Sequence, residues 1–324
     1  MRFGFTTDQR ELAGAVREIL ASELTSEVRA TGADASGRRG PVWKALSEAG
    51  VFGLLVPEEH GGLGLTELDS VLVLEELGLA AAPGPVAETA FVCAPLLAER
   101  PGYADGAVAS VAAETGGYLP DADVADVLIV VAGDDASVLG SGGELTRQPT
   151  VDPSRPLFTL PSASGEPLAG GAALRDRAVL ASAAQLVGAS QHLLDAAVEY
   201  AKTRKQFGRE IGSFQALKHQ LADLMLAVEF ARPLVYRAAY SLAEGKATAS
   251  RDVSAAKVNA AQAGEHAART AIQVHGAIGY TDELDLQYWL KRVWWLVPSW
   301  GDAIQHRARV AAAVIDAAAT ARTP

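Results

Sequence analysis

The chain has 324 residues, a length that can bury two or three sizeable cores. Its formal net charge of −11 argues against nucleic acid or an acidic membrane as a partner. The single cysteine, Cys93, excludes an internal disulfide framework and suits a reducing compartment.

The N-terminal sequence, MRFGFTTDQRELAGAVREIL, lacks the uninterrupted apolar core of a signal peptide. No apolar run approaches the roughly 20 residues of a membrane-spanning helix. We therefore expect a soluble, cytoplasmic protein that has no membrane partner.

Residues 1–100 are predicted to form a helical domain, because apolar residues recur there at helical spacing. Thr66 followed by Asp69 resembles a capping box, the pattern that starts many helices. Four helices are expected: over about 7–31, over about 41–51, from Thr66 to about Leu79, and beyond two prolines to about Glu99.

The middle of the chain, residues 101–172, consists of short β-prone runs such as VLIVVAG and LFTLP. Gly, Asp, Ser and Pro separate these runs, which is typical of strands joined by turns. An abbreviated β domain of five to seven strands is predicted.

The C-terminal part, residues 173–324, has long helical stretches and short loops, which predicts an up-and-down four-helix bundle. Helices are expected over about 174–203, 213–244, 250–278, 284–295 and 302–321. The predicted fold class is therefore mainly α with a small β module.

The most informative stretch joins the first two of these C-terminal helices, around Phe207 and Gly208. Gly208 suits the left-handed end of a helix, and Ser213 suits the N-cap of the next one. The junction is rich in cations, namely Lys202, Arg204, Lys205 and Arg209. Two interpretations are open at this point: a surface that holds an anion, or an inert solvated turn.

Four motifs, together with this layout, resemble the acyl-CoA dehydrogenase family. They are VPEEHGGLGLTELDSVLVLEELG at 56–78, YAKTRKQFGREIGSFQALKHQLADL at 200–224, AIQVHGAIGYTDE at 271–283 and LKRVWWLVPSWGDAIQHR at 290–307. The second motif is the most specific of the four, whereas the last aligns in place but diverges in content.

The resemblance implies FAD as cofactor and an acyl-CoA thioester as substrate, from which hydrogens leave Cα and Cβ. Family members carry an Arg-x-x-Phe-Gly turn that reaches the FAD pyrophosphate of a neighbouring subunit, matched here by Arg204, Gln206 and Phe207. A planar guanidinium makes paired, charge-assisted bonds to phosphate oxygens. Gln215 lies where the family often contacts the cofactor, but an exposed helix glutamine is an equally good explanation.

The family's adenine-binding Gln-x-x-Gly-Gly turn corresponds to Gln273, His275 and Gly276, followed by Ala277 in place of the second glycine. A glycine at this point lets the backbone approach a nucleotide closely. The resemblance therefore implies that both nucleotide-binding turns of the family are kept.

The reaction requires a carboxylate base, and family members place a glutamate at one of two positions. Alignment of the C-terminal turn puts Trp300 at one position, and counting back from Phe207 puts Ala178 at the other. Asp302 is the one carboxylate in the C-terminal turn and is our candidate base, although it is also a good N-cap for the last helix. Asp176 is a weaker candidate, expected instead to pair with Arg175 or Arg177.

The β domain lacks the two family motifs that lie against the flavin ring. The six histidines show no metal-binding spacing, so no metal site is expected. The chain resembles short, glutamate-lacking subunits that pair with a full-length paralogue in an α2β2 assembly, so we interpret it as a non-catalytic FAD-binding subunit. The alternative is a competent dimer or tetramer of this chain alone, with an atypical base such as Asp302.

Overall fold

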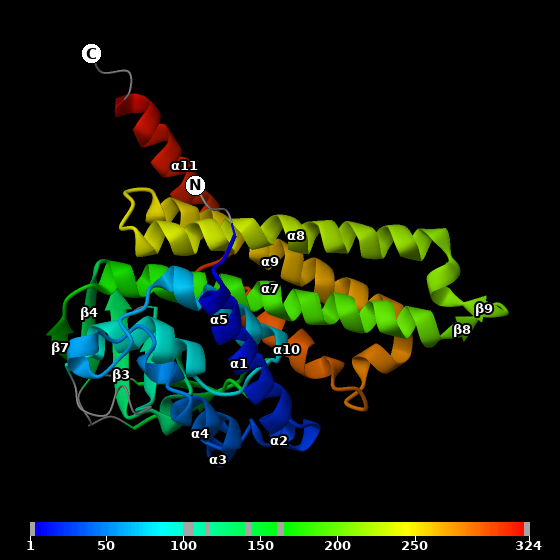
Figure 1. The fold of residues 1–324 in the computed structure, drawn as a ribbon, viewed down its shortest axis with the longest axis horizontal. Helices are drawn as coiled ribbons and strands as arrows, with labels where there is room; N and C mark the ends of the chain where they lie inside the picture. Colours follow the sequence, from blue (N-terminus) through cyan, green and yellow to red (C-terminus); the bar gives the residue numbers. More distant parts are fainter. Residues whose placement is uncertain (1–3, 100–106, 114–116, 140–143, 161–164, 321–324) are drawn as a thin grey trace.

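The computed structural model describes residues 4–99, 107–113, 117–139, 144–160 and 165–320, with side chains described as far as residue 315. Long helices near the C-terminal end form one layer, and the N-terminal helices and the β strands lie along one side of it (Figure 1). The fold class predicted from the sequence, mainly α with a small β module, is confirmed.

Side-chain caps start three of the five α-helices described before residue 80. Thr6 and Gln9 form a capping box at the start of the first helix, and the predicted box of Thr66 and Asp69 is present. These helices are α1 (Thr7–Glu23), α2 (Ser26–Thr31), α3 (Ala35–Arg38), α4 (Pro41–Glu48) and α5 (Glu67–Leu79).

Two expected helices differ in the structure. The helix expected over 7–31 is broken into α1 and α2, because Thr25 is extended and its side chain caps α2 through the Val28 amide. The helix expected near 99 is a π-helix, η3 (Glu88–Cys93), followed by one short α-helical segment, α6 (Ala94–Leu97). π-Helical turns are rare and often occur at functional sites.

The β module has seven strands among the described residues, within the predicted range. One sheet has the order β1-β3-β4-β7, with β1 parallel to β3, and a second sheet has the order β2-β6-β5. The strands are β1 (Ala109–Ala112), β2 (Leu119–Pro120), β3 (Val127–Ala132), β4 (Asp135–Leu139), β5 (Thr146–Gln148), β6 (Leu157–Thr159) and β7 (Gly165–Leu168).

The C-terminal layer is built on α7 (Gly171–Thr203), α8 (Gln215–Ala243) and α9 (Ala249–His275). Short connections make these helices run up, down and up again, so the C-terminal ends of α7 and α9 lie at the end of the bundle where α8 begins. Two further helices follow: α10 (Leu286–Leu296) and α11 (Ala303–Thr320), the latter reaching away from the main body (Figure 1).

The N-terminal domain is fixed to the bundle where α5 crosses α7. Glycines stand on both sides of this contact: a Cβ at Gly78 would clash with the Gln185 backbone, and a Cβ at Gly188 would clash with the Glu75 carbonyl. The close approach places η3 and the end of α10 beside the first half of α7, where the cavity described below lies.

Candidate functional site

The junction of α7 and α8 is a two-residue β-hairpin. Strand β8 (Lys205–Gln206) pairs antiparallel with β9 (Arg209–Glu210), and the two residues between them have positive φ, +53° at Phe207 and +81° at Gly208. Two successive positive φ values define the turn that matches the natural twist of a hairpin. Phenylalanine is unusual in this conformation, which costs about 1–2 kcal/mol.

Two details of the junction were predicted wrongly. Gly208 does not end the helix, since α7 ends at Thr203 and Gly208 lies in the hairpin turn. Ser213 is not the N-cap of α8: Phe214 holds that position, and the Ser213 hydroxyl donates to the Glu210 carbonyl at 2.7 Å. A hairpin satisfies the backbone groups that a broken helix would leave unpaired.

Arg204 and Phe207 project from this hairpin into solvent. The Phe207 side chain is 91% exposed, and Arg204 is also exposed. Lys202 and Lys205 each have a carboxylate partner, at 2.6 Å and 3.3 Å, whereas no carboxylate of the described residues lies within 4.0 Å of the Arg204 guanidinium. The Arg204 guanidinium is therefore available to an external anion.

The Phe214 ring packs against two side chains of the hairpin. Its ring meets that of Phe207 edge-on, with centroids 6.1 Å apart, and the Arg209 guanidinium lies 4.1 Å from its centroid. These contacts orient the Phe207 ring although most of its surface is in solvent.

The second predicted turn follows α9 at the same end of the bundle. His275 is buried, its Nδ1 lies 2.8 Å from the Ala271 carbonyl oxygen, and its ring stacks on Tyr200 of α7 at 4.4 Å. Gln273 and Gly276 are exposed, and Gly276 has φ +66° and ψ −141°, a conformation that favours glycine. The structure thus brings the two turns together, with the His275 side chain beneath the surface.

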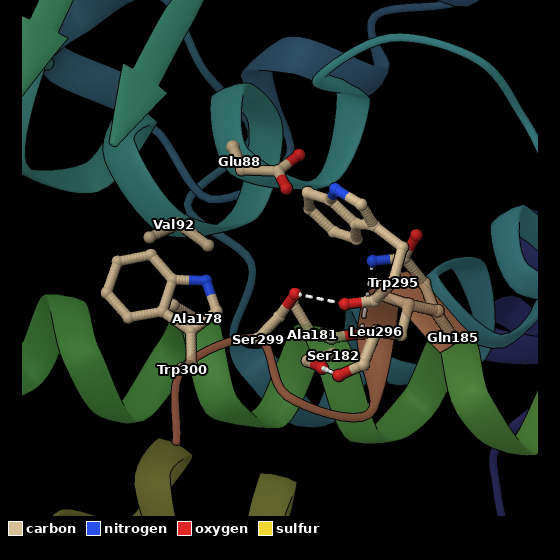
Figure 2. Close-up of a pocket in the computed structure, with 10 residues that line it drawn as sticks. All are labelled: Glu88, Val92, Ala178, Ala181, Ser182, Gln185, Trp295, Leu296, Ser299 and Trp300. Atoms are coloured by element: carbon tan, nitrogen blue, oxygen red, sulfur yellow. Dashed lines mark hydrogen bonds between the residues drawn. The ribbon is translucent and has the colours of Figure 1, made fainter. Parts of the chain in front are cut away.

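The two positions expected to carry a base also meet in space. Ala178 of α7 and Trp300 of the turn before α11 line one small cavity with a volume of about 10 Å³. We call it the inner cavity; Figure 2 shows the indoles of Trp295 and Trp300 on opposite sides of it. Two alignment positions far apart in the chain converge there, as alternative positions for one base should.

Glu88 is the acidic residue among those that line the inner cavity, and the sequence did not lead us to it. It comes from η3 and is 5% exposed, and its carboxylate lies on the Trp295 side of the cavity (Figure 2). The signal available in the sequence was an acidic residue within the apolar run VAETAFVCAPLL, where burial is expected. One oxygen accepts from Arg155 Nη2 at 2.5 Å, whereas Oε2 has no hydrogen-bond partner among the described residues.

Arg155 joins all three parts of the chain around this cavity. Its Nε donates to Asp121 of the β module at 2.8 Å, and its guanidinium lies 4.2 Å from the ring centroid of Trp295 in α10. Removing one partner from such a buried ion pair leaves a charge uncompensated, at a cost of about 3–5 kcal/mol. The Glu88 carboxylate is therefore tied into the packing between domains.

Asp302 is the N-cap of α11. Its Oδ1 accepts from the Ile304 and Gln305 amides at 2.9 Å and 2.8 Å, and its own amide donates to the Gln305 side chain at 3.0 Å. Asp302 is exposed and does not line the inner cavity. The structure thus supports the capping role, and a catalytic role for Asp302 stays a prediction.

Asp176 does not pair as we expected. Its carboxylate accepts from Arg309 of α11 at 2.9 Å, whereas Arg177 pairs with Glu67 at 2.6 Å and Arg175 with Asp134 at 3.8 Å. The reason is tertiary: α11 packs on α9, which brings the Arg309 side chain to Asp176 at the start of α7, and sequence spacing does not reveal this contact.

Comparison with known proteins agrees with the motifs. The model of the acyl-CoA dehydrogenase N-terminal domain matches residues 6–99, and that of the C-terminal domain matches residues 172–315. This chain belongs to the acyl-CoA dehydrogenase family.

Among its relatives in that family is the acyl-CoA dehydrogenase IpdE2 of Mycobacterium tuberculosis, 35% identical over 86% of this chain and 89% of that protein. Among solved structures, one of the ChsE4-ChsE5 complex from the same organism has a TM-score of 0.86 and 26% identity, and covers 100% of both chains. The Tcur3481-Tcur3483 steroid ACAD G363A variant also has a TM-score of 0.86, with 27% identity over 96% of this chain and 98% of that one.

The two exposed turns suit the pyrophosphate and adenine part of FAD, the cofactor of this family. Arg204, which has no carboxylate partner among the described residues, can offer its guanidinium to a pyrophosphate. A Cβ placed on Gly276 would meet no atom within 4 Å, so a nucleotide has open access to the backbone. Gln206 and Gln215 are exposed beside the hairpin. Their contacts with FAD, and those of Gln273 and His275, stay predictions.

Among the described residues no helix of this acyl-CoA dehydrogenase family member is long and apolar enough to cross a membrane. Within the same described part of the chain, no group of three or more His, Cys, Asp or Glu side chains could hold a metal ion.

Proposed function

We propose that this chain is the non-catalytic, FAD-binding subunit of a heteromeric, cytoplasmic acyl-CoA dehydrogenase that carries out α,β-dehydrogenation of an acyl-CoA thioester. It contributes Arg204, Phe207 and Gln273 to an FAD whose flavin ring lies in a full-length partner subunit. The partner supplies the carboxylate base and the acyl pocket, and bound FAD accepts the hydride from Cβ.

The observation that carries the proposal is that the inner cavity has no base at either family position and no room for an acyl chain. Ala178 and Trp300 stand at both family positions for the base, and neither can accept a proton. The cavity volume of about 10 Å³ is the size of one water molecule, far too small for an acyl chain. The neighbouring carboxylate, Glu88, already pairs with Arg155.

Exposed apolar side chains on α8 support a protein partner. Phe230 is 71% exposed on α8, and Met225 and Leu226 are each 48% exposed on the same helix. Phe207 is exposed in the hairpin that precedes the same helix. A second chain of the same fold, docked against these side chains, would bring its FAD to Arg204.

The relatives are consistent with a two-chain assembly. The ChsE4-ChsE5 structure is described as a complex, and the Tcur3481-Tcur3483 structure names two gene products and a steroid substrate class. We therefore propose a full-length acyl-CoA dehydrogenase paralogue as partner and a thioester with a bulky acyl group as substrate.

The test is co-expression of this chain with a neighbouring full-length paralogue, compared with each chain alone. We expect the pair to co-purify with bound FAD and to oxidise acyl-CoA thioesters, whereas this chain alone carries little flavin and shows no turnover. Full FAD occupancy with turnover by this chain alone would contradict the proposal.

The alternative is an oligomer of this chain alone that uses its own atypical base. The location of Glu88 at the inner cavity favours this alternative more than the location of Asp302 does. It requires Arg155 to release the carboxylate and Trp300 to leave the cavity. Turnover by the purified chain that is abolished by Glu88→Gln would establish the alternative.

A further inference from the structure

The turn that contains Trp300 separates two cavities. On one side is the inner cavity, and on the other is an open cleft of about 880 Å³ between the β module and the ends of α10 and α11. We call the latter the outer cleft. Trp295, Ser299 and Trp300 line both spaces. The two cavities therefore meet at these three residues.

Trp300 and Ser299 are the partly exposed members of the inner cavity. Every other residue that lines it is buried. The Trp295 indole is buried and is held by Arg155, whose guanidinium lies 4.2 Å from its ring centroid. The Trp300 indole is thus the side chain whose removal opens the inner cavity toward the outer cleft.

The backbone of Trp300 is held in a conformation that tryptophan rarely adopts. Its φ is +62°, and residues held in such sparsely populated regions cost about 1–3 kcal/mol. The Trp300 carbonyl oxygen lies 3.1 Å from Nε2 of the buried His306. Just before the turn, the Lys257 ammonium donates to the Leu296 carbonyl at 2.5 Å, which pins the end of α10.

We propose that the Trp300 indole excludes acyl chains from this subunit, and that its removal joins the inner cavity and the outer cleft into one pocket for an acyl thioester. This inference rests on the proposed function, since it takes the inner cavity as the counterpart of the partner's catalytic cavity. The inner walls suit an alkyl chain, because Val92, Ala178, Ala181 and Leu296 are among them.

The test is the binding of octanoyl-CoA and of unacylated coenzyme A to the full chain, measured by isothermal titration calorimetry. The wild-type chain should bind the two ligands with equal affinity, since its acyl site is filled. Trp300→Gly, which also suits the positive φ, should bind octanoyl-CoA on the order of 100-fold tighter than coenzyme A, because four buried methylenes contribute about fourfold each. A saturable stoichiometry of one ligand per chain is expected.

Trp294→Ala is the matched control. Trp294 lines the outer cleft but not the inner cavity and is 42% exposed, so this variant should behave as the wild type does. A wild-type chain that prefers octanoyl-CoA at least tenfold, or a folded Trp300→Gly chain that shows no preference, would overturn the proposal. If Trp300→Gly does not fold, Trp300→Leu serves the same comparison with a smaller expected preference.

Failure of the acyl-exclusion proposal is distinguishable from failure of the proposed function. A Trp300→Gly chain that shows no preference for octanoyl-CoA says nothing about whether the chain supplies Arg204 to a partner's FAD. Conversely, a lone chain that carries full FAD would contradict the proposed function without changing the acyl-binding comparison.

Discussion

The ring of Tyr200, near the end of α7, stacks on the imidazole of His275, the last residue of α9, with their centroids 4.4 Å apart. This contact joins the two sequence motifs that resemble nucleotide-binding turns. Ala197, Ala201 and Val274 form the buried cluster behind it. The stack therefore fixes the distance between the hairpin with Arg204 and the turn with Gly276.

Arg204→Lys in the two-chain complex should weaken FAD retention about tenfold, or roughly 1.4 kcal/mol, because an ammonium cannot make the paired bonds of a guanidinium. The measurement is the flavin-to-protein ratio after dilution and gel filtration. Lys202→Ala is the control, since Lys202 is paired with Glu199 and should leave this ratio unchanged. Equal flavin loss in both variants would mean that general surface charge, rather than Arg204, holds the cofactor.

Phe207→Asn separates the structural role of the hairpin turn from its binding role. Asparagine tolerates positive φ better than phenylalanine, and Asn-Gly is the preferred pair for this turn, so the melting temperature should be unchanged or slightly higher. Flavin occupancy of the complex should nevertheless fall severalfold, because the 91% exposed ring is lost. If occupancy stays at the wild-type level, the exposed ring has no role in cofactor binding.

Glu88→Gln should destabilise the chain, because it breaks the buried ion pair with Arg155. Per folded, FAD-bound complex, Glu88→Gln and Asp302→Asn should nevertheless each leave turnover within about twofold of the wild-type rate, far less than the 100-fold or greater loss expected when a catalytic base is removed. Asparagine is as good an N-cap as aspartate, so α11 should remain folded in Asp302→Asn. A large loss of turnover in either variant, with FAD still bound, would place the base in this chain.

Lys257 makes stability depend on pH. The ammonium is fully buried without a carboxylate partner among the described residues, and burial lowers its pKa to about 7. Between pH 7 and about 10 the unfolded chain binds a proton that the folded chain does not, so the free energy of unfolding rises with pH by up to about 1.4 kcal/mol per pH unit.

The Lys257→Met variant lacks this titration. Its free energy of unfolding, measured by urea denaturation, should exceed that of the wild type by more at pH 7 than at pH 9, with a difference of about 2 kcal/mol between the two values. The hydrogen bonds to Ser182 and Leu296 are lost at both pH values. The change in the stability difference between pH 7 and pH 9 therefore reports only the protonation of Lys257. A pH-independent difference would show that burial does not lower the pKa of Lys257.

Features that depend on neighbouring residues were predictable from the sequence. The capping box at Thr66, the long helices of the bundle and the strand-rich middle region follow from side-chain periodicity and turn residues. The break near Phe207 was placed correctly, but its form was not, because a hairpin and a helix cap share the same glycine signal.

Features that depend on contacts between distant segments were not predictable. Glu88 was missed because the chain folds η3 against α7 and α10, and no local motif marks that approach. Asp176 was assigned to its sequence neighbours, whereas the packing of α11 on α9 brings Arg309 to it.

By itself the sequence determined the fold class and located the two turns that resemble nucleotide-binding turns, because helix periodicity and turn residues are local features, and its four motifs indicated the family. Only the tertiary structure decided that the turns share one end of the bundle and that Ala178, Trp300 and Glu88 meet in one nearly filled cavity. The physical reason is that the size of a cavity depends on side chains from three separate segments, and their packing is a property of the folded chain alone.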